Sequence, residues 1–87
     1  MHTPTLKDLE REAKGAEKVV QATEKLIHDL RVQASIVKDD ETLKPIETRI
    51  AKLRYRLNQE KETLAQSQAR LRQAKQDFQQ FGETNTL

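Results

Sequence analysis

The sequence has no cysteine and very few glycine, proline and aromatic residues. Among 87 residues there are two Gly, two Pro, two Phe, one Tyr and no Trp. Without cysteine there is no disulfide framework and no thiolate chemistry, which fits a reducing compartment. No apolar run approaches the roughly 20 residues that cross a bilayer, and the start lacks the apolar stretch of a secretory signal. We therefore expect a cytoplasmic protein with no membrane association.

Residue patterns that support common enzymatic chemistry are missing as well. The histidines are His2 and His28, and neither has a metal-ligating residue four positions further on. Ser35 and Ser67 have no histidine and aspartate nearby in the sequence to activate a hydroxyl. Both glycines stand alone, so there is no Gly-rich phosphate loop. We expect no enzymatic activity, no metal and no cofactor.

Charged residues, by contrast, are abundant. They make up 34% of the chain, which is also rich in glutamine, alanine and leucine. This composition is typical of long helices and coiled coils. High charge with low hydrophobicity is also typical of disordered chains, so the periodicity has to decide between the two.

Apolar and small residues recur at alternating spacings of three and four in two runs. This is the average 3.5-residue repeat of a coiled coil, whose seven positions are lettered a to g, with a and d facing the partner helix. The first run is Leu6, Leu9, Ala13, Ala16, Val20, Thr23, Ile27, Leu30, Ala34 and Val37, and the second is Ile46, Ile50, Leu53, Leu57, Glu60, Leu64, Ser67, Leu71, Ala74, Phe78 and Phe81. Leu6 and Ile50 each occupy an a position. A disordered chain would not keep this pattern, so the sequence predicts an all-α protein.

The segment DDETLKPIE separates the two runs. Pro45 cannot donate a helical hydrogen bond and disfavours helical geometry at Lys44, unless both residues lie in the first turn of a helix. Asp39, Asp40 and Thr42 are typical of the start of a new helix. We therefore predict an antiparallel two-helix coiled-coil hairpin rather than one long helix.

The hairpin is expected to form a single domain over residues 1–87. Helix one should begin after Thr3 with Pro4 in its first turn, or with a capping pair of Thr5 and Asp8. A left-handed cap is expected at Gly82. The expected bounds are about 4–39 for helix one, about 39–44 for the turn, about 43–81 for helix two and 83–87 for a frayed tail.

The expected register is the one in which the numbers of facing residues add up to 87. Leu9 then faces Phe78, and Ala13 faces Ala74 at a narrow waist. The flanking pairs of opposite charge in this register are Glu10 with Lys75, Glu24 with Lys61, Lys38 with Glu47 and Asp40 with Arg49. Two flanking pairs are mismatched, namely Arg31 with Arg54 and Glu12 with Asp77.

Helix one carries apolar or small residues outside positions a and d. They are Gly15, Val19, Ala22, Leu26, Val32 and Ile36. The first four are spaced by four, three and four residues, which aligns them on one side of the helix. One interpretation is a contact surface that lets two chains form a four-helix bundle. The other is scattered exposed aliphatic residues, which are normal on any surface. We expect the contact surface, and hence a homodimer.

Glu60 is an acidic residue at a d position of the second run. It could be a buried polar residue that fixes the register of the two helices. Alternatively, its aliphatic stem lies along the other helix while the carboxylate turns to water or to an arginine. We favour the second interpretation.

Positive charge is concentrated in helix two. Residues 43–81 hold nine basic and four acidic residues, whereas residues 6–40 hold seven basic and eight acidic ones. Arg49, Lys52 and Arg56 recur on one ridge, and Tyr55 beside them could stack on a base. A basic helix face is usually just solvated, and the net charge of the chain is only +2.

Together these patterns predict a non-enzymatic protein–protein interaction module. It would act as a small adaptor, regulator or inhibitor that packs a helix face against a protein partner. A small nucleic-acid-binding regulator that uses the basic face of helix two is the alternative. A structural subunit of a larger helical assembly is a third, weaker interpretation.

Overall fold

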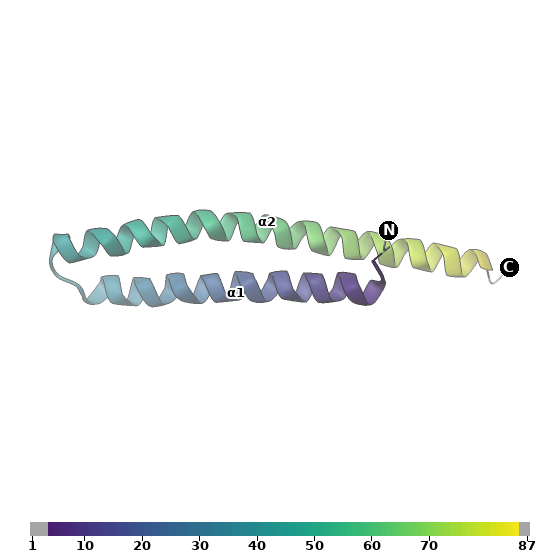
Figure 1. Ribbon diagram of the computed structural model, residues 1–87, viewed down its shortest axis with the longest axis horizontal. Helices are drawn as coiled ribbons and strands as arrows, with labels where there is room; N and C mark the ends of the chain where they lie inside the picture. Colours follow the sequence, from purple (N-terminus) through teal and green to yellow (C-terminus); the bar gives the residue numbers. More distant parts are fainter. Residues whose placement is uncertain (1–3, 86–87) are drawn as a thin grey trace.

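The computed structural model of the chain is an antiparallel hairpin of two long helices (Figure 1). Helix α1 is Leu6–Ile36 and helix α2 is Asp40–Asn85. The structure describes residues 4–85, with side chains described for residues 4–79. Its dimensions are 71 × 24 × 14 Å, those of a thin rod. The predicted all-α helical hairpin is confirmed.

Helix α1 begins at a capping box. The Thr5 hydroxyl accepts a hydrogen bond from the Asp8 backbone N–H, and the Asp8 carboxylate accepts one from the Thr5 N–H, both at 3.2 Å. These two bonds satisfy backbone donors that no carbonyl in the first helical turn can reach. Of the two predicted starts, the structure therefore has the Thr5 pair. Thr3 lies outside the described residues.

The turn is shorter and earlier than predicted. It consists of Val37, Lys38 and Asp39, and α2 begins directly afterwards at Asp40, so the predicted turn at 39–44 is wrong. Val37 ends α1 because its backbone is extended, with φ −76° and ψ 132°. Asp39 then caps α2: its carboxylate accepts hydrogen bonds from the Thr42 hydroxyl at 2.6 Å and from the Thr42 N–H at 3.0 Å.

The hydrogen bonds of Asp39 favour its charged form. The Thr42 hydroxyl, and after it the Thr42 backbone N–H, lowers the pKa of the Asp39 carboxyl below its ordinary value. The folded chain therefore keeps this cap ionised at a lower pH than an unfolded chain would. Its contribution to stability is present above the ordinary aspartate pKa and is lost as the pH falls through the lowered value.

Pro45 does not interrupt α2. Both Lys44 and Pro45 are helical and lie near the start of α2, where a proline is tolerated. Pro45 lies only a few residues after Asp40, so the one missing hydrogen bond frees the carbonyl of Glu41 near an exposed helix end. At the other end, α2 continues through Gly82 to Asn85, beyond the expected cap and into the expected tail.

The residues predicted at a and d form the contact between the helices, which we call the seam. Those on α1 are mostly buried, namely Leu9, Ala13, Val20, Thr23, Ile27 and Leu30. Those on α2 are half-buried from Ile46 to Ala74, apart from the fully buried Ser67. The heptad pattern therefore identified the correct face of each helix.

The register of the seam differs from the predicted one by one heptad. Glu12 was expected to face Asp77, but its carboxylate accepts a hydrogen bond from Arg70 Nη2 at 2.8 Å, seven residues earlier on α2. Phe78, expected to pack on Leu9, is 66% exposed. Figure 1 shows why: the C-terminal part of α2 continues past the start of α1. Because the observed turn is shorter than the predicted one, each α1 residue faces a residue of α2 that comes earlier in the sequence than expected.

The new register resolves one of the two expected charge mismatches. Glu12, expected to face Asp77, is paired with Arg70 instead. Arg31 and Arg54, expected to face each other, still line the same two hollows beside the seam, the first together with Glu24 and the second together with Glu47. An exposed ion pair such as that of Glu12 with Arg70 contributes about 0.2–1 kcal/mol.

Ser67 is a deeply buried polar residue on the seam. This residue is 1% exposed, and within the described part of the chain its hydroxyl oxygen is buried without a hydrogen-bond partner. In the observed register Ser67 lies opposite Ala13, which is 9% exposed. A buried hydroxyl without a partner costs about 1–3 kcal/mol. The burial of Ser67 therefore comes at some cost in stability.

Candidate protein-interaction surface

Four of the predicted contact residues form an exposed row on one side of α1. We call Gly15, Val19, Ala22 and Leu26 the side stripe. All four are exposed, with Val19 at 46% and Leu26 at 45%. A large aliphatic side chain left half in water gains free energy when a partner covers it. The side stripe is therefore a candidate surface for helix packing.

The remaining two predicted contact residues are also exposed but differ in position. Ile36, at 71% exposure, is the last residue of α1 and lies two heptads after Ala22, on the same side of the helix. Val32, at 47%, follows Leu26 by six residues and so points about 120° away from it around the helix. The structure thus places Val32 on the outer face of α1, away from the side stripe.

Gly15 leaves open space at the surface. A β-carbon built at this position would meet no atom within 4 Å. Packing inside the hairpin therefore does not require a glycine, although glycine costs about 1 kcal/mol in a helix relative to alanine. The absence of a side chain would, however, let the backbone of another helix approach closely.

A groove joins the side stripe to α2. It has a volume of about 200 Å³ and is lined by Ala16, Val19, Arg56, Gln59, Glu60 and Thr63. Two residues from different predicted surfaces meet here: Val19 from the side stripe and Arg56 from the basic ridge. Sequence reasoning missed this neighbourhood because it depends on the register.

Glu60 is the acidic residue that lines this groove. Its side chain is 13% exposed, and Oε2 accepts a hydrogen bond from Arg56 Nε at 3.1 Å. Oε1 is buried, and no hydrogen-bond partner for it lies within the described residues. The predicted arginine neighbour is therefore present, but the carboxylate does not turn fully to water. A partner that brings a hydrogen-bond donor to Oε1 would gain affinity from satisfying it.

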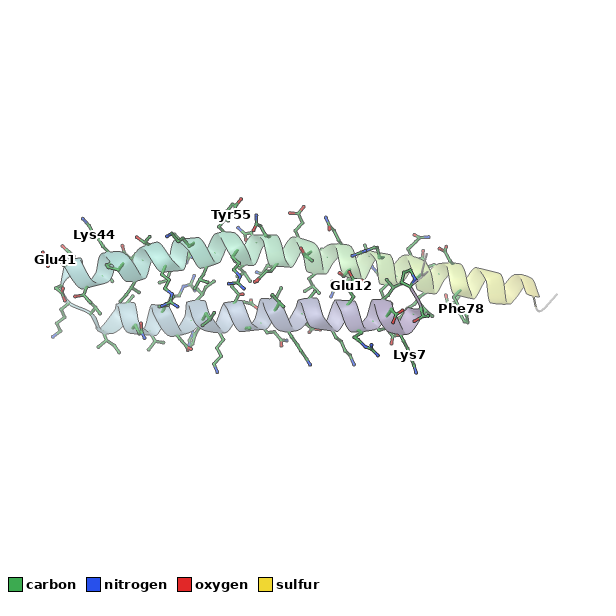
Figure 2. The ribbon with its side chains drawn as sticks, in the orientation of Figure 1. Lys7, Glu12, Glu41, Lys44, Tyr55 and Phe78 are labelled. Carbon is green, nitrogen blue, oxygen red and sulfur yellow. The ribbon has the colours of Figure 1, made fainter. Side chains whose placement is uncertain are left out.

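The basic ridge is divided in the structure. Arg49 and Lys52 line a shallow hollow near the turn together with Lys44, which the sequence analysis did not include. Tyr55 is 69% exposed and points away from α1 (Figure 2). Arg56 belongs instead to the groove beside Val19, where it is paired with Glu60. The hollow near the turn therefore brings together Lys44, Arg49 and Lys52 with one acidic neighbour, Glu41, and Tyr55 is exposed further along α2.

Two kinds of site are absent from the described part of the chain. Nowhere between residues 4 and 79 do three or more His, Asp or Glu side chains come together in a way that could hold a metal ion. Neither α1 nor α2, as far as they are described, contains an apolar stretch long enough to cross a membrane.

The side stripe, the groove and the basic ridge are the surface features that this geometry offers. Comparison of the chain with protein-family models, with curated proteins and with solved structures gave no match. The function therefore has to be argued from these surfaces alone.

Proposed function

We propose that the chain is a non-enzymatic protein-interaction module that packs the side stripe against a helix of a protein partner. The observation that supports this proposal is the row of half-exposed Val19 and Leu26 separated by small residues at Gly15 and Ala22. Amphipathic helices recognise one another through such rows of side chains three and four residues apart. The cytoplasm, suggested by the absence of cysteine, is the proposed location.

The simplest partner is a second copy of the chain. Two helices bury a single seam, and domains of this size seldom gain more than about 3–5 kcal/mol from one core. A two-fold dimer would place the two side stripes against each other and convert the hairpin into a four-helix bundle. Arg56 and Glu60 flank the contact and would select for partners of complementary charge.

The variant Leu26→Asp tests this proposal. The aspartate would place a charge in the dimer contact, but it leaves the seam intact, so we expect a monomer that is still helical. Sedimentation equilibrium gives the mass and circular dichroism gives the helix content. The matched control is Val32→Asp, with similar exposure on the outer face of α1, which should leave the mass unchanged. An unchanged oligomer mass in Leu26→Asp would refute the side stripe as the contact.

The variant Gly15→Ala tests independently whether another helix packs closely against the side stripe. Within one hairpin the new methyl group meets no neighbour, so the helix should gain about 1 kcal/mol. If another helix packs closely at Gly15, the dimer should nevertheless dissociate more readily. A variant that dimerises as tightly as the original chain would show that no close contact occurs at this position.

The alternative function is nucleic-acid binding by the outer face of α2. It is supported by Lys44, Arg49 and Lys52 around one hollow, with Tyr55 exposed nearby. Such a surface would neutralise phosphates and release counterions. Replacing Lys44, Arg49 and Lys52 together with alanine should then weaken binding and reduce the slope of log affinity against log salt by about 3. If the unmodified chain retains neither RNA nor DNA at low salt, this alternative is excluded.

A further inference from the structure

The seam of α2 is longer than the helix that covers it. Helix α2 has 46 residues and α1 has 31. Five a positions of α2 follow one another at seven-residue intervals, namely Ile50, Leu57, Leu64, Leu71 and Phe78. The first four are half-buried against α1, whereas Phe78 is 66% exposed. The same row of side chains thus continues past the end of α1, where α1 no longer covers it.

The hydrogen bond between Glu12 and Arg70 shows where along α2 the contact with α1 ends. Helix α1 begins six residues before Glu12, so its first residue lies beside α2 near residue 76. We call residues 77–85 the overhang. Figure 2 shows Phe78 beyond Lys7 and the start of α1. An exposed phenylalanine on an outer face needs no explanation, but this one continues a packed row.

We propose that the overhang pairs with the overhang of a second copy, antiparallel, so that two hairpins join end to end. The contact continues the seam of one hairpin into that of the next and covers Phe78 of both chains. An antiparallel pair uses the same packing as the hairpin itself. In an antiparallel pair the two hairpins also extend away from each other. In a parallel pair the α2 helix of the partner would enter the space that α1 occupies.

The charge of the overhang weakens this pairing. Residues 77–85 include two acidic residues, Asp77 and Glu83, and no basic one, so the contact should strengthen when salt screens the repulsion between two copies. The overlap of two overhangs is about 14 Å long, because each residue of a helix adds about 1.5 Å. Such a short contact is expected to be weak and to depend strongly on protein concentration.

The end-to-end contact is independent of the side stripe and gives a different shape. It should lengthen the 71 Å rod to about 130 Å without thickening it, since two rods overlap over a short stretch. Packing through the side stripe would thicken the rod and leave its length nearly unchanged. Small-angle X-ray scattering distinguishes the two shapes.

The experiment measures the longest particle dimension over a concentration series of the whole chain carrying Leu26→Asp. We expect the dimension to rise with concentration towards the end-to-end value. Adding Phe78→Asp should lower the association constant at least about tenfold, because a central aromatic contact is lost. The control Gln79→Asp adds the same charge at the next residue, which does not belong to the seam row, and should retain most of the association.

Three outcomes separate this proposal from the proposed function. No lengthening at any concentration overturns the end-to-end contact. Equal losses in Phe78→Asp and Gln79→Asp also overturn it, since the charge rather than the seam would then be responsible. A Leu26→Asp chain that still forms a thick, short dimer contradicts the side stripe and leaves the end-to-end contact to be judged by the lengthening alone.

Discussion

Replacing Ile27 with aspartate should unfold the hairpin at room temperature. Ile27 is 5% exposed and lies near the middle of α1 on the seam. Loss of a buried aliphatic side chain of this size costs about 2–5 kcal/mol, and an unpaired carboxylate in the same place adds a desolvation penalty. A single core of this size supplies only about 3–5 kcal/mol, so little or no stability would remain.

The matched control is again Val32→Asp, on the same helix but 47% exposed. Valine and aspartate have similar helix propensities, so this control should change the stability by no more than about 0.5 kcal/mol. Circular dichroism during thermal unfolding measures both variants. A cooperative melt of Ile27→Asp close to that of the original chain would show that the seam is not where the structure places it.

The positions of the seam could be predicted from the sequence, but the register could not be read from the same pattern. A shift of seven residues again places a opposite d, so the heptad pattern alone allows both registers. They differ in the flanking residues. The expected register left Glu12 facing Asp77, whereas the observed one pairs Glu12 with Arg70. The mismatch of these two acidic residues was a signal for the observed register.

The turn was misplaced because proline is a weaker signal here than a helix cap. Pro45 suggests a break, but near the start of a helix it removes only one hydrogen bond. Asp39 with Thr42 supplies two hydrogen bonds to the helix start, and these define where α2 begins. Capping residues were identified from the sequence, but not the exact position at which they act.

The candidate surfaces were predictable to different degrees. Exposure of Val19 and Leu26 follows from their positions outside a and d on a single helix. The neighbourhood of Val19 and Arg56 involves both helices, so it needs the register as well as the heptad pattern. The partial burial of Glu60 could not be read from the sequence for the same reason.

The second prediction concerns the register itself, on which the groove, the overhang and the exposure of Phe78 all depend. The chain has no cysteine, so pairs of cysteines can be introduced without competing thiols. A disulfide requires Cα atoms no more than about 7 Å apart, whereas a shift of one heptad moves a residue by about 10 Å along the helix. Disulfide formation therefore distinguishes the two registers.

Two double variants should be oxidised at low concentration, and the linked monomer should be quantified on a non-reducing gel. Ala13→Cys with Ser67→Cys places a cysteine pair where the structure has facing residues. Ala13→Cys with Ala74→Cys places it where the register expected from the sequence has them. The account predicts rapid formation of an intramolecular disulfide in the first variant and little in the second. Preferential linkage of the second variant would contradict the hairpin register and the surfaces derived from it.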